Sequence, residues 1–327
     1  MSMSKTSKNQ TQTNEEAKKD NKKSIIAPND SVKITLKWSS VEPLYKKSLN
    51  KFAKNVKAEG FRVGKAPLAI VEQKVGFEKI ADEVLRELLP EAYTAQVKKE
   101  NKKPITSPEF NPLSLEKGQD WSLEAFFSLL PEVKLGDYKK VAKKGKAEAA
   151  KFVEQRNAEI KKEAEAHEKG KHGDDHDHKH SHEPLGENEI KEINLQHIFK
   201  NLVDAFAPAI GELLLRQETQ AEYERLLEQL KQYNISPEDY LQKRGVTIEQ
   251  LSQELAGTVL SRLQLDFIMA AISQAEKLEA TDEEVQKELL QITNLKMRQE
   301  VEKNQDYITQ IKANLLQRKT LDLLLAL

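Results

Sequence analysis

The stretch Gly60-Phe61-Arg62-Val63-Gly64-Lys65-Ala66-Pro67 organises the first part of the chain, because it joins two helical patterns. Gly60 and Gly64 allow backbone angles that other residues avoid. Pro67 suits the first turn of the helix that follows, where its missing N–H costs nothing. These residues predict a rigid, exposed loop between two helices.

The side chains of this loop have the composition of a binding site. We expect Phe61, Arg62 and Lys65 to point into solvent, where an aromatic ring offers contact area and cations meet carboxylates or phosphates. The preceding helix is also basic, since residues 46–65 hold seven lysines and arginines and one acid, Glu59. The alternative interpretation is an ordinary solvated helix face followed by a tight turn.

The pattern Gly-Phe-Arg-x-Gly-x-x-Pro at 60–67 resembles the ribosome-docking loop of the trigger factor family, bacterial chaperones that meet nascent chains at the tunnel exit. Residues from about 31 to 138 resemble the family's whole ribosome-binding domain, including the runs 70–76 and 89–93. Residues from about 193 to the end are similar, more loosely, to its helical carboxyl-terminal domain. The resemblance implies a ribosome-binding site made of Gly60, Phe61, Arg62, Gly64, Lys65 and Pro67.

The resemblance also implies a role for each side chain of the loop. Phe61 would pack on ribosomal protein near the tunnel exit, while Arg62 and Lys65 would pair with acidic side chains or rRNA phosphates. The family often has a further cation directly after the Phe-Arg pair, where this chain has Val63. We expect Val63 to affect the strength of docking and to leave its location unchanged.

Composition excludes several classes of protein and site. The 327 residues carry a net charge of −1, so the whole molecule is not a polyanion binder and any basic site is local. The absence of cysteine excludes disulfides, thiolate metal sites and a cysteine nucleophile. The first 23 residues have no apolar core and resemble no secretory signal, and no run of 18 apolar residues occurs. We therefore expect a cytoplasmic protein that binds neither a membrane nor DNA.

The first domain is predicted to be α+β. Val32, Ile34, Leu36 and Trp38 alternate with polar residues and predict a strand. Three helices follow: one before the loop, a short one from Pro67 to about 76, and a longer one bent at Pro90. Two further strands are expected near 105–115 and 121–130, with Gly118 in the turn between them. Together they predict a small antiparallel sheet with helices packed on one side.

The sequence pattern divides the whole chain into four segments. Residues 1–23 are expected to form a disordered tail and 24–140 the ribosome-binding domain. Residues 141–189 read as a polar helix and a His-rich flexible linker. Residues 190–327 read as a mostly α-helical, elongated chaperone domain with capping boxes at Thr247 and Thr281.

The His-rich tract is the one metal candidate of the sequence. Neutral imidazole binds Zn²⁺ and Ni²⁺, and a flexible chain with alternating histidines can wrap around an ion. No pair of these histidines is held at i, i+4 spacing by a predicted helix, so we expect weak or adventitious binding rather than a resident cofactor. A physiological metal role is the alternative. The candidate ligands are His172, His176, His178, His180 and His182.

No catalytic pattern is present, and carboxylates lie beside lysines as on solvated helices. Trigger factors usually carry an FK506-binding-type prolyl-isomerase domain between the two similar regions. Here residues 140–192 contain one aromatic, Phe152, and cannot build an aromatic-lined pocket. We therefore expect no enzyme activity.

The resemblance thus implies an ATP-independent chaperone that docks at the ribosomal exit tunnel and shields apolar segments of nascent or unfolded polypeptides. A holdase or assembly chaperone that works without the ribosome is the alternative, and an RNA-binding module is a third. The shielding surface is expected on apolar helix faces such as 251–271 and 307–325. A closed bundle, in which these faces cover one another, is the competing interpretation.

Overall fold

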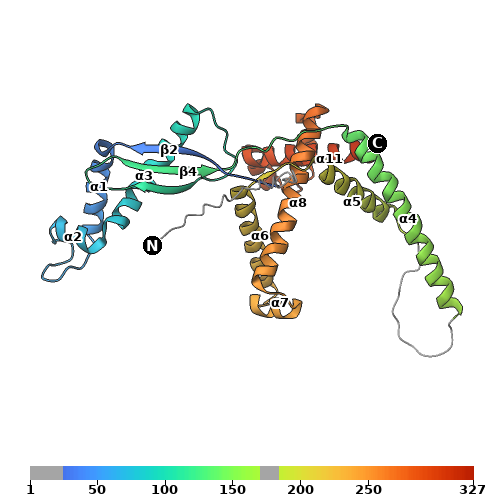
Figure 1. Cartoon of the computed structure of the whole chain (residues 1–327), viewed down its shortest axis with the longest axis horizontal. Helices are drawn as coiled ribbons and strands as arrows, with labels where there is room; N and C mark the ends of the chain where they lie inside the picture. Colours follow the sequence, from blue (N-terminus) through green and yellow to red (C-terminus); the bar gives the residue numbers. More distant parts are fainter. Residues whose placement is uncertain (1–24, 170–183) are drawn as a thin grey trace, which may run out of the picture.

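The computed structural model describes residues 25–169 and 184–327. Its N-terminal part is a three-stranded antiparallel sheet of order β2-β4-β3 with helices on one face (Figure 1). The elements are β2 Asp30–Leu36, α1 Trp38–Ala53, α2 Leu68–Val75, α3 Phe77–Lys99, β3 Glu109–Ser114 and β4 Trp121–Phe127. The predicted α+β domain is confirmed.

The sheet has one buried face because two of its strands alternate strictly. Val32, Ile34 and Leu36 of β2 and Trp121, Leu123, Ala125 and Phe127 of β4 point inward, and the residues between them are more exposed. This face forms one core with Tyr45 and Leu49 of α1, Val71 of α2 and Ile80 and Val84 of α3. Burial of these apolar side chains holds α1, α2 and α3 on the sheet.

Several predicted boundaries are wrong by a few residues. The first strand ends at Leu36, and Trp38 begins α1, where its N–H donates to Asp120 Oδ1 (2.7 Å). Pro67 lies just before α2, in an extended conformation, rather than in its first turn. β3 and β4 are shorter than predicted, while α3 runs as a single helix through Pro90.

The rest of the described chain is almost entirely helical, and Figure 1 shows it as a central body with two projecting arms. One arm is α4 Tyr138–Lys169 packed along α5 Glu187–Phe206. The other is α6 Glu212–Gln232 packed along α8 Ile248–Ala275, with the short α7 Pro237–Arg244 at its tip. Three further helices, α9 Asp282–Leu290, α10 Leu295–Lys303 and α11 Gln305–Ala326, complete the C-terminal part. The elongated helical domain is confirmed.

The body is held by a core shared among α4, α5, α8 and α11. Tyr138 and Ala142 of α4 lie in one cluster with Ile198 and Leu202 of α5, Ile268 and Ile272 of α8, and Leu324 of α11. The predicted polar helix therefore begins earlier, at Tyr138, and its first turns belong to this core. Within the described ranges, α8 is the one helix long and apolar enough to cross a membrane, and we interpret it as the central helix of this body, because it packs on α5, α6 and α11.

The two parts of the molecule meet at the start of α6. β1 Ile26–Ala27 pairs in parallel with β5 Ile210–Gly211. Gly211, at the N-cap of α6, has no capping side chain, so two residues of the N-terminal part supply the acceptors. Asn29 Oδ1 accepts from the Leu213 N–H (2.8 Å) and Ser128 Oγ from the Leu214 N–H (3.1 Å). These bonds satisfy N–H groups that the first turn of a helix cannot satisfy itself.

Candidate functional site

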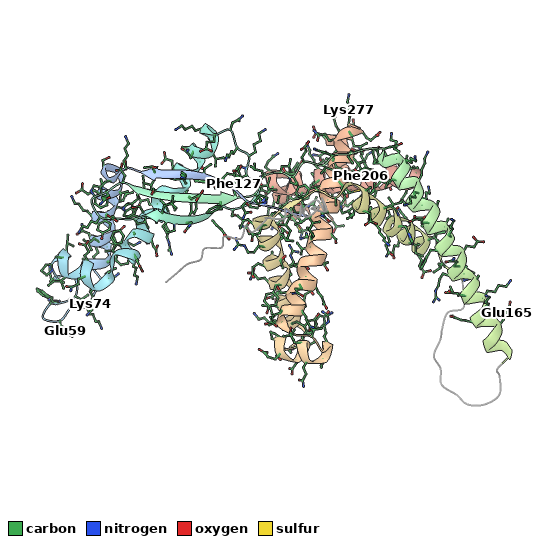
Figure 2. All side chains as sticks on the ribbon, viewed as in Figure 1. Glu59, Lys74, Phe127, Glu165, Phe206 and Lys277 are labelled. Carbon is green, nitrogen blue, oxygen red and sulfur yellow. The ribbon has the colours of Figure 1, made fainter. Side chains whose placement is uncertain are left out.

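The loop of residues 60–67 lies at one end of the molecule. Figure 2 labels Glu59 and Lys74 beside it at this end, while Glu165 of α4 lies at the opposite end. Gly60 and Gly64 have φ of +78° and +82°, which other residues rarely adopt, as predicted. Two backbone hydrogen bonds between residues three positions apart stabilise turns in the loop. They run from the Phe61 N–H to the Ala58 carbonyl (3.1 Å) and from the Lys65 N–H to the Arg62 carbonyl (2.9 Å).

The loop presents apolar side chains to solvent. Phe61 is 42% exposed and Val63 47%, and Leu68 in the first turn of α2 is exposed beside them. The structure thus brings Phe61, Arg62 and Lys65 together on an exposed loop, as the sequence predicted. Leu68 was missed, although an apolar residue directly after the loop proline was a visible signal.

The cations of the loop differ from those of α1 in their partners. On α1, Lys46 pairs with Glu42 (2.6 Å) and Lys47 with Glu87 (2.9 Å), and Lys51 pairs with Glu83. By contrast, no carboxylate of the described chain pairs with the four cations between the end of α1 and the start of α2, which are Lys54, Lys57, Arg62 and Lys65. The positive charge of the basic stretch is therefore neutralised along the helix and left available at the loop.

A partly exposed hydrogen-bond network connects α2, the element that follows the loop, to α1 and to the turn between β3 and β4. The hydroxyl of Tyr45, a residue only 3% exposed, donates to Glu72 Oε1 (2.8 Å), and Lys117 Nζ donates to both carboxylate oxygens (2.6 and 2.8 Å). The hydrogen bond from Lys117 is the largest cause that lowers the pKa of Glu72. Burial and the neighbouring carboxylate raise the pKa of Tyr45. The sequence pattern gave no sign of this contact, because the three residues are far apart in the chain.

The helical part offers a second kind of surface. The apolar stripe predicted on α8 is largely internal, since Leu251, Val259 and Leu263 are buried, and so are Leu315 and Leu324 of α11. Exposed apolar side chains gather instead on the segment from α9 to the start of α11. They are Leu290, Leu295, Met297 and Tyr307.

The second arm carries a separate groove of about 460 Å³. It lies between α6 and α8 and is lined by apolar residues such as Leu215, Tyr223, Ile248 and Leu255. The helical part therefore exposes apolar area partly within the predicted stripes, at Leu255 and Tyr307, and partly outside them, at Leu290, Leu295 and Met297.

The proposed metal ligands His172, His176, His178, His180 and His182 lie outside the described residues. Within 25–169 and 184–327, no three His, Cys, Asp or Glu side chains are grouped as a metal site requires. His197, which lies outside the His-rich tract, is half-buried on α5, and its ring packs near that of Phe152 (5.6 Å between centroids).

Comparison with known proteins covers both parts of the chain. The family model described as bacterial trigger factor protein matches residues 18–166, and the one described as its C-terminus matches residues 180–326. The trigger factor of Streptococcus suis is 37% identical over 131 residues, which is 40% of this chain and 30% of that protein. The trigger factor of Streptococcus pyogenes is 35% identical over 134 residues, 41% of this chain and 31% of that protein.

A solved structure is similar over most of the fold. It was described for promiscuous substrate recognition in folding and assembly activities of the trigger factor chaperone. The TM-score is 0.52 at 16% sequence identity, with 91% of this chain and 97% of that chain covered. The chain matches about three tenths of the length of the curated relatives named above. Because the two family models describe the two ends of one kind of protein and together match nearly all of this sequence, the chain belongs to the trigger factor family.

Proposed function

We propose that this protein is an ATP-independent chaperone that docks at the ribosomal exit tunnel through the loop of residues 60–67. The observation that carries the proposal is the exposed apolar tip of Phe61, Val63 and Leu68, surrounded by cations without an intramolecular partner in the described chain. Apolar contact area and unpaired cations fit an acidic protein surface bordered by RNA phosphates. The family supports the same function, and the cytoplasm is the corresponding location.

In this proposal, docking and client binding use separate surfaces. The loop lies at one end of the molecule (Figure 1). The exposed apolar residues of α9–α11 and the groove of the second arm belong to the helical part. A molecule anchored by its loop would hold these surfaces near an emerging chain. Each apolar surface is small, so contact with an unfolded segment would be weak and reversible, as a chaperone without nucleotide needs.

The test of docking is co-sedimentation with ribosomes. Phe61→Ala combined with Arg62→Ala removes the exposed ring and one unpaired cation, and both changes are on the surface, so the fold should be unaffected. We expect the double variant to be lost from the ribosome pellet. Tyr233→Ala with Lys231→Ala is the matched control, because it removes an exposed aromatic and a cation from the end of α6. Equal pelleting of both double variants would reject the docking loop.

A chaperone that works without the ribosome is the second candidate, favoured by the exposed Leu290, Leu295 and Met297. It predicts that the full chain slows aggregation of an unfolded client in the absence of ribosomes. Leu295→Ser with Met297→Ser should weaken this effect and leave ribosome pelleting unchanged. If the double variant suppressed aggregation as well as the unaltered chain, this surface would not be the client site.

We further propose that the protein does not catalyse prolyl isomerisation. Residues 138–169 form a helix rather than a pocket-bearing sheet, and the two family models meet on either side of residues 167–179. In a prolyl-peptide assay we expect isomerisation at the uncatalysed rate, with a time constant on the order of tens to hundreds of seconds. Acceleration in proportion to protein concentration would contradict this.

A further inference from the structure

The loop and the short helix α2 follow one another in the chain, and α2 attaches to the domain through few buried side chains. α2 has eight residues, with Val71 as its fully buried side chain, and it contacts α1 and α3. The loop before it ends at Pro67, whose carbonyl accepts from the N–H groups of Ile70 (3.0 Å) and Val71 (3.1 Å). The position of the loop therefore depends on how firmly α2 is held.

Glu72 is the polar group that ties α2 to two other elements at once. Its carboxylate accepts from Tyr45, which is part of the core on α1, and from Lys117, which lies in the turn between β3 and β4. Lys117 Nζ also lies 5.7 Å from the centroid of the Tyr45 ring. Tyr45 lies 27 positions before Glu72 in the sequence, and Lys117 lies 45 positions after it. The two contacts therefore constrain the tertiary placement of α2 rather than the helix itself.

We propose that Glu72 is the positioning residue of the docking loop: by bridging Tyr45 and Lys117 it holds α2, and with it residues 60–67, in the orientation that presents Phe61 and Arg62. This inference rests on the proposed ribosome docking for its functional consequence, and on the contacts alone for its structural one. A pre-positioned loop binds more tightly, because its ordering does not have to occur on binding. Charge-assisted bonds suit this task, since they are shorter and stronger than bonds between neutral groups.

The test is Glu72→Gln in the full chain, which keeps the size of the side chain and removes its charge. We expect faster hydrogen exchange at the amides of residues 60–71, unchanged exchange in β2 and β4, and ribosome affinity reduced about three- to tenfold. Glu78→Gln is the matched control, because Glu78 is an exposed acid in the first turn of α3. The exchanged pair Glu72→Lys with Lys117→Glu should restore part of the protection.

The possible outcomes separate the two claims. Wild-type exchange at 60–71 in Glu72→Gln would overturn the positioning role, whatever the ribosome assay shows. Faster exchange that includes β2 and β4 would also overturn it, because Glu72 would then support the whole domain. If the unaltered chain failed to pellet with ribosomes, the proposed docking would fail, while hydrogen exchange would still decide whether Glu72 positions the loop.

Discussion

Val63 is the residue of the loop 60–67, the proposed docking loop, in which this chain departs from the family pattern. Its side chain is 47% exposed and lies between Arg62 and Lys65, two cations without a carboxylate partner in the described chain. A larger polar side chain therefore has room at this position, and its effect on folding should be small. The residue decides how many charges the loop brings to its partner.

Val63→Lys should tighten ribosome association and make it more dependent on salt, because each added contact with an acidic or phosphate surface is electrostatic. The measurement is the fraction of protein in the ribosome pellet at increasing salt. Val63→Gln is the control for polar bulk without charge. Identical salt curves for the Lys and Gln variants would show that position 63 does not contact the ribosome.

Glu284 is a residue whose charge joins two helices. Its carboxylate accepts from Lys319 Nζ of α11 (2.7 Å) and from the backbone N–H of Thr281 at the start of α9 (2.9 Å). These bonds lower the pKa of Glu284 to about 2. A carboxyl whose pKa is lower in the folded than in the unfolded chain stabilises the fold at pH values above the unfolded pKa of 4.5, and this stabilisation is lost as pH falls toward 2.

We expect Glu284→Gln to lower the thermal midpoint of the helical part at neutral pH, and this difference from the unaltered chain to shrink between about pH 4.5 and 2. Glutamine still fits the capping box at Thr281, so the variant isolates the charge. Glu283→Gln, at the neighbouring exposed acid, is the control. A difference that stayed constant down to pH 2 would mean that the ion pair is not the cause.

At the scale of elements, two glycines inside helices have opposite surroundings. A Cβ on Gly145 of α4 would lie 2.8 Å from the His197 carbonyl oxygen and 2.8 Å from the Ile198 Cα of α5. Both atoms belong to backbone, so the two helices of this arm would have to separate. A Cβ on Gly257 of α8 would meet nothing within 4 Å.

Gly145→Ala should therefore destabilise the chain by about 1–3 kcal/mol, the usual cost of overpacking. Gly257→Ala should stabilise it by about 0.5–1 kcal/mol, because alanine is the better helix former and has free space. Denaturant unfolding followed by circular dichroism at 222 nm measures both. The same sign for the two substitutions would contradict the close packing of α4 on α5.

At the scale of the whole molecule, α4 is the first helix after the N-terminal domain, and its first turns belong to the core of the helical body. Tyr138 and Ala142 lie in one core with Ile198, Leu202 and Leu324, and the Tyr138 hydroxyl donates to Glu276 Oε1 (2.5 Å) at the end of α8. A helical fragment that starts at residue 190, where the sequence reasoning begins this domain, would expose that core. A stable fragment has to include α4.

We expect residues 132–327 to unfold cooperatively and to remain soluble, whereas residues 189–327 should show a lower midpoint and aggregate. Both fragments lack Asn29 and Ser128, which cap α6. The comparison therefore isolates the contribution of residues 132–188, which include α4. Thermal circular dichroism and sedimentation measure the two properties. Equal midpoints would place α4 outside the cooperative unit.

Local features were predictable from the sequence because their causes lie within a few residues. The positive φ of Gly60 and Gly64, the capping box at Thr247 and the alternation of β4 all appear in the structure where the pattern placed them. Such features depend on backbone sterics and on side chains within one turn or one strand. The family pattern added the likeness to a docking loop.

Features that depend on pairing distant segments were decided by the tertiary structure. The sequence shows a run of lysines, but only the fold pairs Lys47 with Glu87 and leaves Lys54 and Lys65 without a carboxylate in the described chain. It shows apolar stripes, but helix packing buries that of α8 and exposes Leu295 instead. Periodicity states that a face is apolar, and which neighbour covers that face depends on contacts far apart in the chain. The bridge from Glu72 to Tyr45 and Lys117 exists for the same reason only in the folded molecule.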